Sequence, residues 1–114
     1  TDEGVIEADH VVLALGNGAR ALARPLGLDL PIYPLKGYSL TLDVADEAEA
    51  PRISVTDSAA KVVYARLGRR LRVAGMADLV GEDHRIEEAR LDSLLRLARA
   101  AFPKASDWRE IRPW

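Results

Sequence analysis

The sequence contains no cysteine, so disulfide bonds and thiolate metal sites are excluded. It also has few aromatic residues, at 5%, and only two histidines, His10 and His84, far apart in the chain. Because a metal site needs several converging ligands, we expect none here. No apolar run approaches the roughly 20 residues that a membrane-spanning helix needs.

An excess of one charge is absent as well. The chain has 16 basic and 18 acidic residues, a net charge of −2, and the basic residues are spread along it. Neither a nucleic-acid surface nor an anionic-membrane surface is therefore indicated. With 114 residues and 48% hydrophobic content, the chain can form one packed domain. It starts without methionine and closes on the apolar run WREIRPW, from which we expect a piece of a longer protein.

A glycine pattern follows an apolar run near the N-terminus. Residues 11–15, VVLAL, lack alternation, which predicts a strand covered on both faces. Residues 16–21, GNGARA, fit the dinucleotide-binding pattern G-x-G-x-x-A. Pro25 and Gly27 stop the following helix after barely two turns, and no acidic residue lies about 20 positions on to bind a ribose. The pattern is therefore weak evidence for a complete phosphate-binding turn.

The remainder of the chain changes its hydrophobic period once. Three stretches have the strand period: 38–44, 61–66 and 70–77. Gly68-Arg69 between the last two predicts a hairpin turn. From Asp83 the apolar spacing becomes helical, which predicts a helix over 84–102 with Asp83 as its N-cap and Pro103 at its end. We predict an α+β fold in which a mainly antiparallel sheet packs on this helix.

Alternation also predicts which strand residues share a face. In the last stretch, Leu71 and Gly75 should lie on one face and Arg72 and Met76 on the other. Gly75 lies inside a strand, where glycine weakens packing and permits close approach of backbone or ligand.

Four segments, taken in order, resemble D-amino-acid dehydrogenases of the D-amino-acid oxidase and glycine oxidase superfamily. They are ADHVVLALG, PIYPLKGYSLTL, KVVYARLGRRLRVAGMADLVG and DWREIRPW. The first is shared by many flavoproteins, whereas YPLKGYSLT and RLGRRLRVAGMA are typical of the dehydrogenase branch. The resemblance implies that residues 1–30 are the trailing part of an FAD-binding domain. It implies that residues 31–114 are part of a substrate-binding domain with a mainly antiparallel sheet.

The same resemblance implies a function for the full-length parent. It would use FAD to oxidise a D-amino acid to a 2-oxo acid and ammonia, and would pass electrons to an acceptor such as a quinone. We expect it in the cytoplasm, with a peripheral association with the inner membrane.

Two parts of the family pattern do not occur in these 114 residues. There is no N-terminal GxGxxG, and Trp114 stands where the family continues RP with methionine. Without the pyrophosphate cradle, the segment alone is expected to bind FAD weakly or not at all and to be inactive. An unpaired sheet edge would allow copies of the segment to associate.

The resemblance assigns five residues. Arg112 matches the arginine that pairs with the substrate carboxylate, a role that suits a planar guanidinium fork. Tyr64 and Met76 would line the substrate pocket. Gly16 would lie where the chain passes the dinucleotide, and Lys36 near the flavin, where its charge would stabilise the reduced ring. The sequence contains no nucleophile constellation and no paired carboxylates, so we expect no catalytic acid or base.

Each of these residues also has an ordinary structural interpretation, as a surface arginine, a strand tyrosine, a core methionine or a solvated lysine. Two other functions stay open at this point. One is a glycine- or sarcosine-type oxidase that passes electrons to oxygen, and the other is a non-catalytic α+β binding module without flavin. The stretch YPLKGYSLT favours the dehydrogenase.

Overall fold

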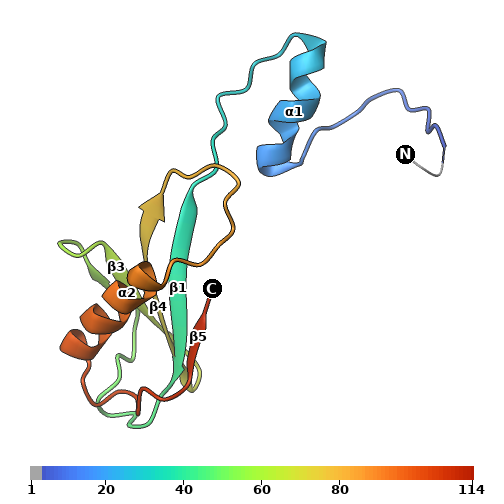
Figure 1. The fold of residues 1–114 in the computed structure, drawn as a ribbon. Coiled ribbons are helices and arrows are strands. Elements are labelled where there is room, and N and C mark those ends of the chain that lie inside the picture. The colour runs from blue at the N-terminus through green and yellow to red at the C-terminus, as the bar shows by residue number, and fades with distance from the viewer. Residues whose placement is uncertain (1–3) are drawn as a thin grey trace. The chain divides into compact units, whose positions relative to one another are not determined.

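The computed structural model describes residues 4–114 (Figure 1). The chain divides into two compact units, one ending at Pro34 and the other comprising Leu35–Trp114. Pro31 and Pro34 precede the boundary, and their fixed φ favours the extended backbone found there. The assignment of the two units to a cofactor domain and a substrate domain stays a prediction.

The first unit contains one short helical segment. A 3-10 turn, η1 (Gly16–Gly18), leads into helix α1 (Ala19–Ala23), and a second 3-10 turn, η2 (Arg24–Leu26), follows. Gly27 has a φ of 78° and ends the segment, because glycine adopts this left-handed conformation at little cost. The predicted short helix, stopped at Pro25 and Gly27, is confirmed.

The predicted strand over residues 11–15 is wrong. These residues have no regular secondary structure, and Val11 and Val12 are 80% and 84% exposed. A strand needs a neighbour to satisfy its backbone donors and acceptors. Among residues 4–114 no strand pairs with this run, so its hydrophobicity alone does not produce one.

The second unit is built on a five-stranded antiparallel sheet with the order β2-β3-β4-β1-β5. The strands are β1 (Lys36–Asp43), β2 (Val55–Asp57), β3 (Val62–Leu67), β4 (Arg70–Asp78) and β5 (Ile111–Pro113). The three predicted strands and the hairpin turn at Gly68-Arg69 are confirmed. The two strands that alternation did not predict have three residues each, too few to show a period.

Helix α2 (Glu88–Ala101) covers one face of the sheet (Figure 1). Leu94 and Ala98 lie one turn apart and are fully buried. They pack in one cluster with the buried residues of the sheet: Leu40, Leu42, Val62, Leu71 and Val73. The predicted sheet-on-helix arrangement is therefore confirmed. No helix of the described residues is long and apolar enough to cross a membrane.

The beginning of α2 differs from the prediction. The N-cap is Glu87, which makes no side-chain capping bond, and Asp83 lies outside the helix. Asp83 accepts hydrogen bonds from the backbone N–H of Arg85, at 3.0 Å, and from its guanidinium group, at 2.9 and 3.0 Å. These bonds hold the pKa of Asp83 well below its ordinary value. The carboxylate thus stabilises a local turn instead of capping the helix.

Gly75 lies where β4, β3 and α2 approach most closely. A Cβ atom there would be 2.8 Å from the backbone oxygen of Lys61 and 3.0 Å from Cγ2 of Val62. It would also be 3.3 Å from Cδ2 of Leu94 on the helix. The close approach that glycine permits is thus made by both backbone and core side chains.

The residue after Gly75 forms a β-bulge. Gly37 pairs with Ala77 and Tyr38 pairs with Gly75, which leaves Met76 as an extra residue in β4. Its φ is 66°, a conformation that residues with a side chain rarely adopt. The bulge interrupts the alternation of β4, and Met76 packs partly against the core.

We expect Gly75→Ala to lower the free energy of unfolding by about 1–3 kcal/mol, as overpacking of a dense core does. Gly37→Ala is the matched control in the same sheet, because its Cβ would have no atom nearer than 4.0 Å. Urea unfolding of both variants measures the difference. Equal midpoints for the two variants would contradict the packing explanation.

Candidate functional site

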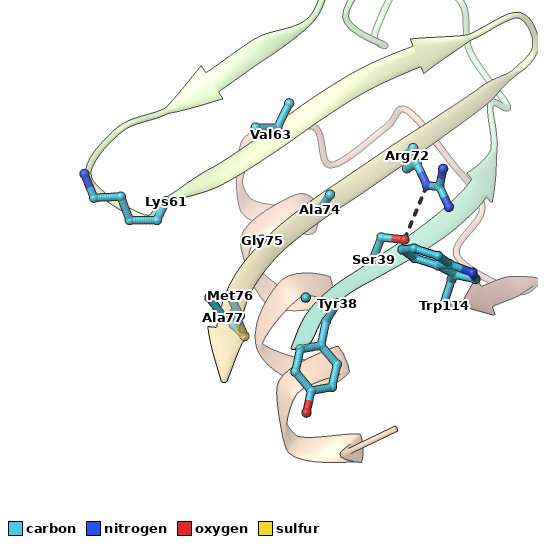
Figure 2. Close-up of a pocket in the computed structure, with 11 residues that line it drawn as sticks. Tyr38, Ser39, Lys61, Val63, Arg72, Ala74, Gly75, Met76, Ala77 and Trp114 are labelled. Carbon is cyan, nitrogen blue, oxygen red and sulfur yellow. Dashed lines mark hydrogen bonds between the residues drawn. The ribbon is translucent and has the colours of Figure 1, made fainter. Parts of the chain in front are cut away.

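A pocket of about 750 Å³ lies on the Leu35–Trp114 unit (Figure 2). Its lining comes from β1, β3, β4 and their ends: Gly37, Tyr38, Ser39, Lys61, Val63, Arg72, Ala74, Gly75, Met76, Ala77 and Trp114. Most of these are apolar or small. A concave, mostly apolar hollow with a few polar groups is typical of a small-molecule site, and its volume lies in the usual range of roughly 300–1,000 Å³.

Strand alternation explains why the pocket forms on this side. One side of the sheet is covered by α2, which is the one helix of Leu35–Trp114. We call the opposite side, which carries Ser39, Thr41, Arg72 and Ala74, the open face. In Figure 2, Tyr38 is directed toward α2, whereas Arg72 lies at Ser39 and Trp114. The open face thus presents polar and small side chains that no helix of this unit covers.

Trp114 is held against β1 by its backbone. The backbone N–H of Ser39 donates to the Trp114 carbonyl at 2.7 Å, and that of Trp114 donates to the Ser39 carbonyl at 2.8 Å. These two bonds extend the β1–β5 pairing beyond Pro113. The indole is 74% exposed, and it forms one side of the pocket.

Arg72 is fixed by two contacts. Its Nε donates to the hydroxyl of Ser39 at 3.3 Å, and Ser39 itself is 3% exposed. The guanidinium carbon lies 5.3 Å from the centroid of the Trp114 ring, within the range of a cation–π contact. Together these contacts hold a half-buried positive charge at the side of the pocket (Figure 2).

Arg112 lies on β5 opposite Thr41, and Arg72 lies opposite the same residue on β4. The two arginines therefore flank Thr41 across three adjacent strands. Arg112 forms an ion pair with Asp43, with Nη2 and Oδ1 2.6 Å apart, and both side chains are about half exposed. A guanidinium has several N–H donors, so this pair leaves others free.

Tyr64, predicted to line the substrate pocket, is not among the residues that line this pocket, and its role stays a prediction. Its ring is 2% exposed on the α2 side and meets Phe102 edge-on, with centroids 5.2 Å apart. Pairing with Val73 places it among the core residues. Met76, in contrast, is among the residues that line this pocket.

Neither of the two residues predicted to contact the cofactor is among the residues that line this pocket. Lys36 donates from Nζ to the carbonyl of Arg85 at 3.0 Å and lies 3.8 Å from Asp83. Gly16 belongs to the first unit, where its φ is 53° and an added Cβ would meet no atom within 4 Å. Its positive φ thus explains the glycine locally. The cofactor roles of both residues stay predictions.

Sequence reasoning did not single out Ser39, Arg72 and Trp114. A signal existed for Arg72, because alternation places it on the face opposite Leu71. Nothing in the sequence indicates that Ser39 and Trp114 meet it, since the three residues come from separate strands that pair only in the fold.

The sequence matches known proteins along its whole length. The profile of the family DAO, FAD dependent oxidoreductase, matches residues 1–114. D-amino acid dehydrogenase 2 of Pseudomonas aeruginosa is 53% identical over 110 residues, which cover 96% of this chain and 26% of that relative. D-amino acid dehydrogenases of Paramagnetospirillum magneticum and Vibrio cholerae are 47% and 45% identical over 114 residues, 27% of each relative. No solved structure matches significantly.

The chain spans about a quarter of the length of these relatives. The pocket is lined by residues of the Leu35–Trp114 unit.

The buried position of Tyr64 generates a pH prediction. Burial, and secondly the nearby Asp57 carboxylate, raise the pKa of Tyr64 above its ordinary value of 10.0. Above that pH the unfolded phenol ionises while the folded one stays neutral. The contribution of Tyr64 to the free energy of unfolding is therefore fully present below pH 10.0, and it is lost as the pH rises through the pKa of the folded state.

We expect Tyr64→Phe to flatten this alkaline loss of stability, measured by urea unfolding from neutral pH to about pH 11. Tyr33→Phe is the control, because Tyr33 is 57% exposed. A loss that stays as steep in Tyr64→Phe as in Tyr33→Phe would show that another group causes it.

Proposed function

We propose a function from one premise: the chain belongs to the DAO family of FAD dependent oxidoreductases. This membership disagrees with the alternative of a binding module without flavin. The names of the relatives support the dehydrogenase branch. The protein that carries this chain is proposed to be a D-amino acid dehydrogenase.

In the proposed reaction a D-amino acid loses a hydride from its α-carbon and a proton from its amino group, which gives an imino acid. Water then adds and ammonia leaves, which gives the 2-oxo acid. When bound, FAD supplies the acceptor for the hydride. The residues of this chain bind and orient the substrate.

The observation that carries this proposal is an arginine beside an apolar pocket on one open sheet face. Arg112 is proposed to bind the substrate carboxylate through the donors that Asp43 leaves free, because a fork of N–H groups matches two carboxylate oxygens. The ion pair with Asp43 restricts the guanidinium and thereby helps to orient it. The Arg112 backbone is in turn fixed by strand pairing at Thr41.

The apolar part of the pocket is proposed to receive the substrate side chain. Ala74, Met76 and Ala77 supply this surface and exclude water from it. The lining includes no histidine, aspartate or glutamate. The wall formed by this chain thus orients the substrate without offering a carboxylate or imidazole base.

The described residues do not fit the phosphate end of FAD. At the glycines of the first unit, α1 has five residues and forms no built phosphate site. The Tyr38 hydroxyl is buried on the α2 side of the sheet, so it does not contact a group bound in the pocket. We therefore assign to this chain a wall of the substrate site and no phosphate site.

The electron acceptor is proposed to be a quinone, with the enzyme in the cytoplasm and peripherally associated with the inner membrane. A glycine- or sarcosine-type oxidase, which reduces oxygen instead, is the alternative. Oxygen consumption measured against quinone reduction separates the two. The outer edges of β2 and β5 have no partner strand among the described residues, which supports self-association of the isolated segment.

We expect Arg112→Lys in the full-length protein to lower kcat/KM for D-alanine at least about tenfold, because lysine keeps the charge but loses the paired donors. Arg112→Ala should cost more, since the substrate carboxylate loses its partner. Steady-state kinetics with a dye acceptor, together with the bound flavin content, measures both effects.

Arg109→Ala is the matched control for these variants, because Arg109 is an exposed arginine just before β5. It should leave kcat/KM unchanged. Wild-type kinetics in Arg112→Ala would remove Arg112 from the site, and loss of flavin would instead assign it to the cofactor or the fold.

We expect the isolated 114-residue segment to show no turnover with added FAD, D-alanine and a dye acceptor. It supplies a substrate wall but no phosphate cradle among its described residues, so a flavin is not held productively. Dye reduction above the level of a protein-free sample would contradict this prediction.

A further inference from the structure

We propose that the guanidinium of Arg72 is a second carboxylate-binding group of this pocket, supported by Ser39 and Trp114. The inference deepens the proposed function and rests on it, because the ligand of the pocket is taken to be an amino acid.

Arg72 differs from the other partly buried cations. The described residues include four such side chains: Arg20, Lys36, Arg66 and Arg72. The first three lie 3.3, 3.8 and 3.1 Å from a carboxylate oxygen of Asp29, Asp83 and Glu47. For Arg72 no carboxylate of the described residues lies within 4.0 Å. Because a partly desolvated charge without a counter-charge is costly, a bound anion would stabilise this position.

The contacts of Arg72 also leave the two terminal amino groups of its guanidinium free to bind a carboxylate. Nε is used by the Ser39 hydroxyl at 3.3 Å, and the Trp114 ring supports the guanidinium at 5.3 Å. Among the described residues neither terminal amino group donates a hydrogen bond. A carboxylate can therefore approach these free donors while Ser39 and Trp114 hold the group in place.

The pocket has a matching shape and polarity. Arg72 and Trp114 lie toward one end, and Met76 and Ala77 lie at the other (Figure 2). A ligand with one anionic and one apolar end fits this arrangement. Arg112 is not part of the lining, so Arg72 is the guanidinium that the pocket itself presents.

The carboxylate has two possible sources in an amino acid. Thr41 separates Arg72 and Arg112 by two strand spacings, so their Cα atoms are about 10 Å apart. Two long side chains at this distance can meet at one α-carboxylate. Alternatively, Arg72 binds the side-chain carboxylate of an acidic substrate while Arg112 binds the α-carboxylate.

The test compares Arg72→Gln and Arg72→Lys with Arg70→Gln in the flavin-loaded full-length protein. Arg70 is a matched control on the same strand and face, but it is exposed and outside the pocket lining. Butyrate, a carboxylate without an amino group, probes α-carboxylate binding by calorimetry. D-glutamate and D-glutamine, which have nearly the same shape, probe a side-chain carboxylate through kcat/KM.

If Arg72 binds the α-carboxylate, Arg72→Gln should weaken butyrate binding at least about tenfold and lower kcat/KM equally for both amino acids. If it binds the side-chain carboxylate, butyrate binding should stay unchanged and the D-glutamate to D-glutamine ratio should fall at least about tenfold. Either result supports the proposal. Arg72→Lys should show the same pattern with a smaller loss. If Arg72→Gln does not retain flavin, the test uses Arg72→Lys in its place.

The proposal would be overturned if both Arg72 variants bound butyrate as tightly as Arg70→Gln does and also kept its ratio of kcat/KM for D-glutamate to that for D-glutamine. Failure of the proposed function looks different, because the unmutated protein would then turn over neither amino acid. In that case butyrate calorimetry alone decides whether Arg72 binds a carboxylate.

Discussion

The absence of a side chain at Gly75 sets how closely the sheet and helix α2 approach each other. A Cβ there would lie 2.8 Å from the backbone oxygen of Lys61, the residue before β3, and 3.3 Å from Cδ2 of Leu94. Only glycine allows both contacts at once, because a side chain there would overlap closely packed atoms. The next residue, Met76, takes up the extra length of β4 in a bulge. Two adjacent residues thus affect the two sides of the sheet. Gly75 allows close packing against α2, and Met76 lines the pocket.

Two of the three described non-glycine residues with a positive φ line the pocket, and the third, Trp108, does not. Lys61 and Met76 both have positive φ values, 58° and 66°, and both line it. Such conformations persist where surrounding structure determines them, and they occur often at functional sites. Here the Asp57 carboxylate accepts hydrogen bonds from Ala59 and Ala60 and so holds the turn before Lys61. The strained positions support the assignment of this face to ligand binding.

Charge on the open face is arranged unevenly. Arg112 is tied to Asp43 at the sheet edge, whereas Arg72 is held by a neutral hydroxyl and an aromatic ring. Neutral supports orient a guanidinium without cancelling its charge, and a neighbouring carboxylate cancels part of it. The charge that Arg72 brings to the pocket is therefore not offset by a carboxylate of the described residues. An amino-acid substrate, whose carboxylate needs a fixed partner, is suited to such a surface.

The sequence alone determined where the main strands and the helix lie, because the spacing of apolar residues along the chain is a local property. It predicted three strands of the sheet, the hairpin turn at Gly68 and the end of α2 before Pro103. Its resemblance to a flavoenzyme family agrees with the match over the whole chain.

Only tertiary structure decided which neighbour covers each side. Residues 11–15 are apolar but have no partner strand among the described residues, Asp83 binds Arg85 instead of the helix, and Tyr64 turns toward Phe102. The grouping of Arg72, Ser39 and Trp114 likewise depends on pairing between strands distant in sequence, and no local pattern encodes such pairing.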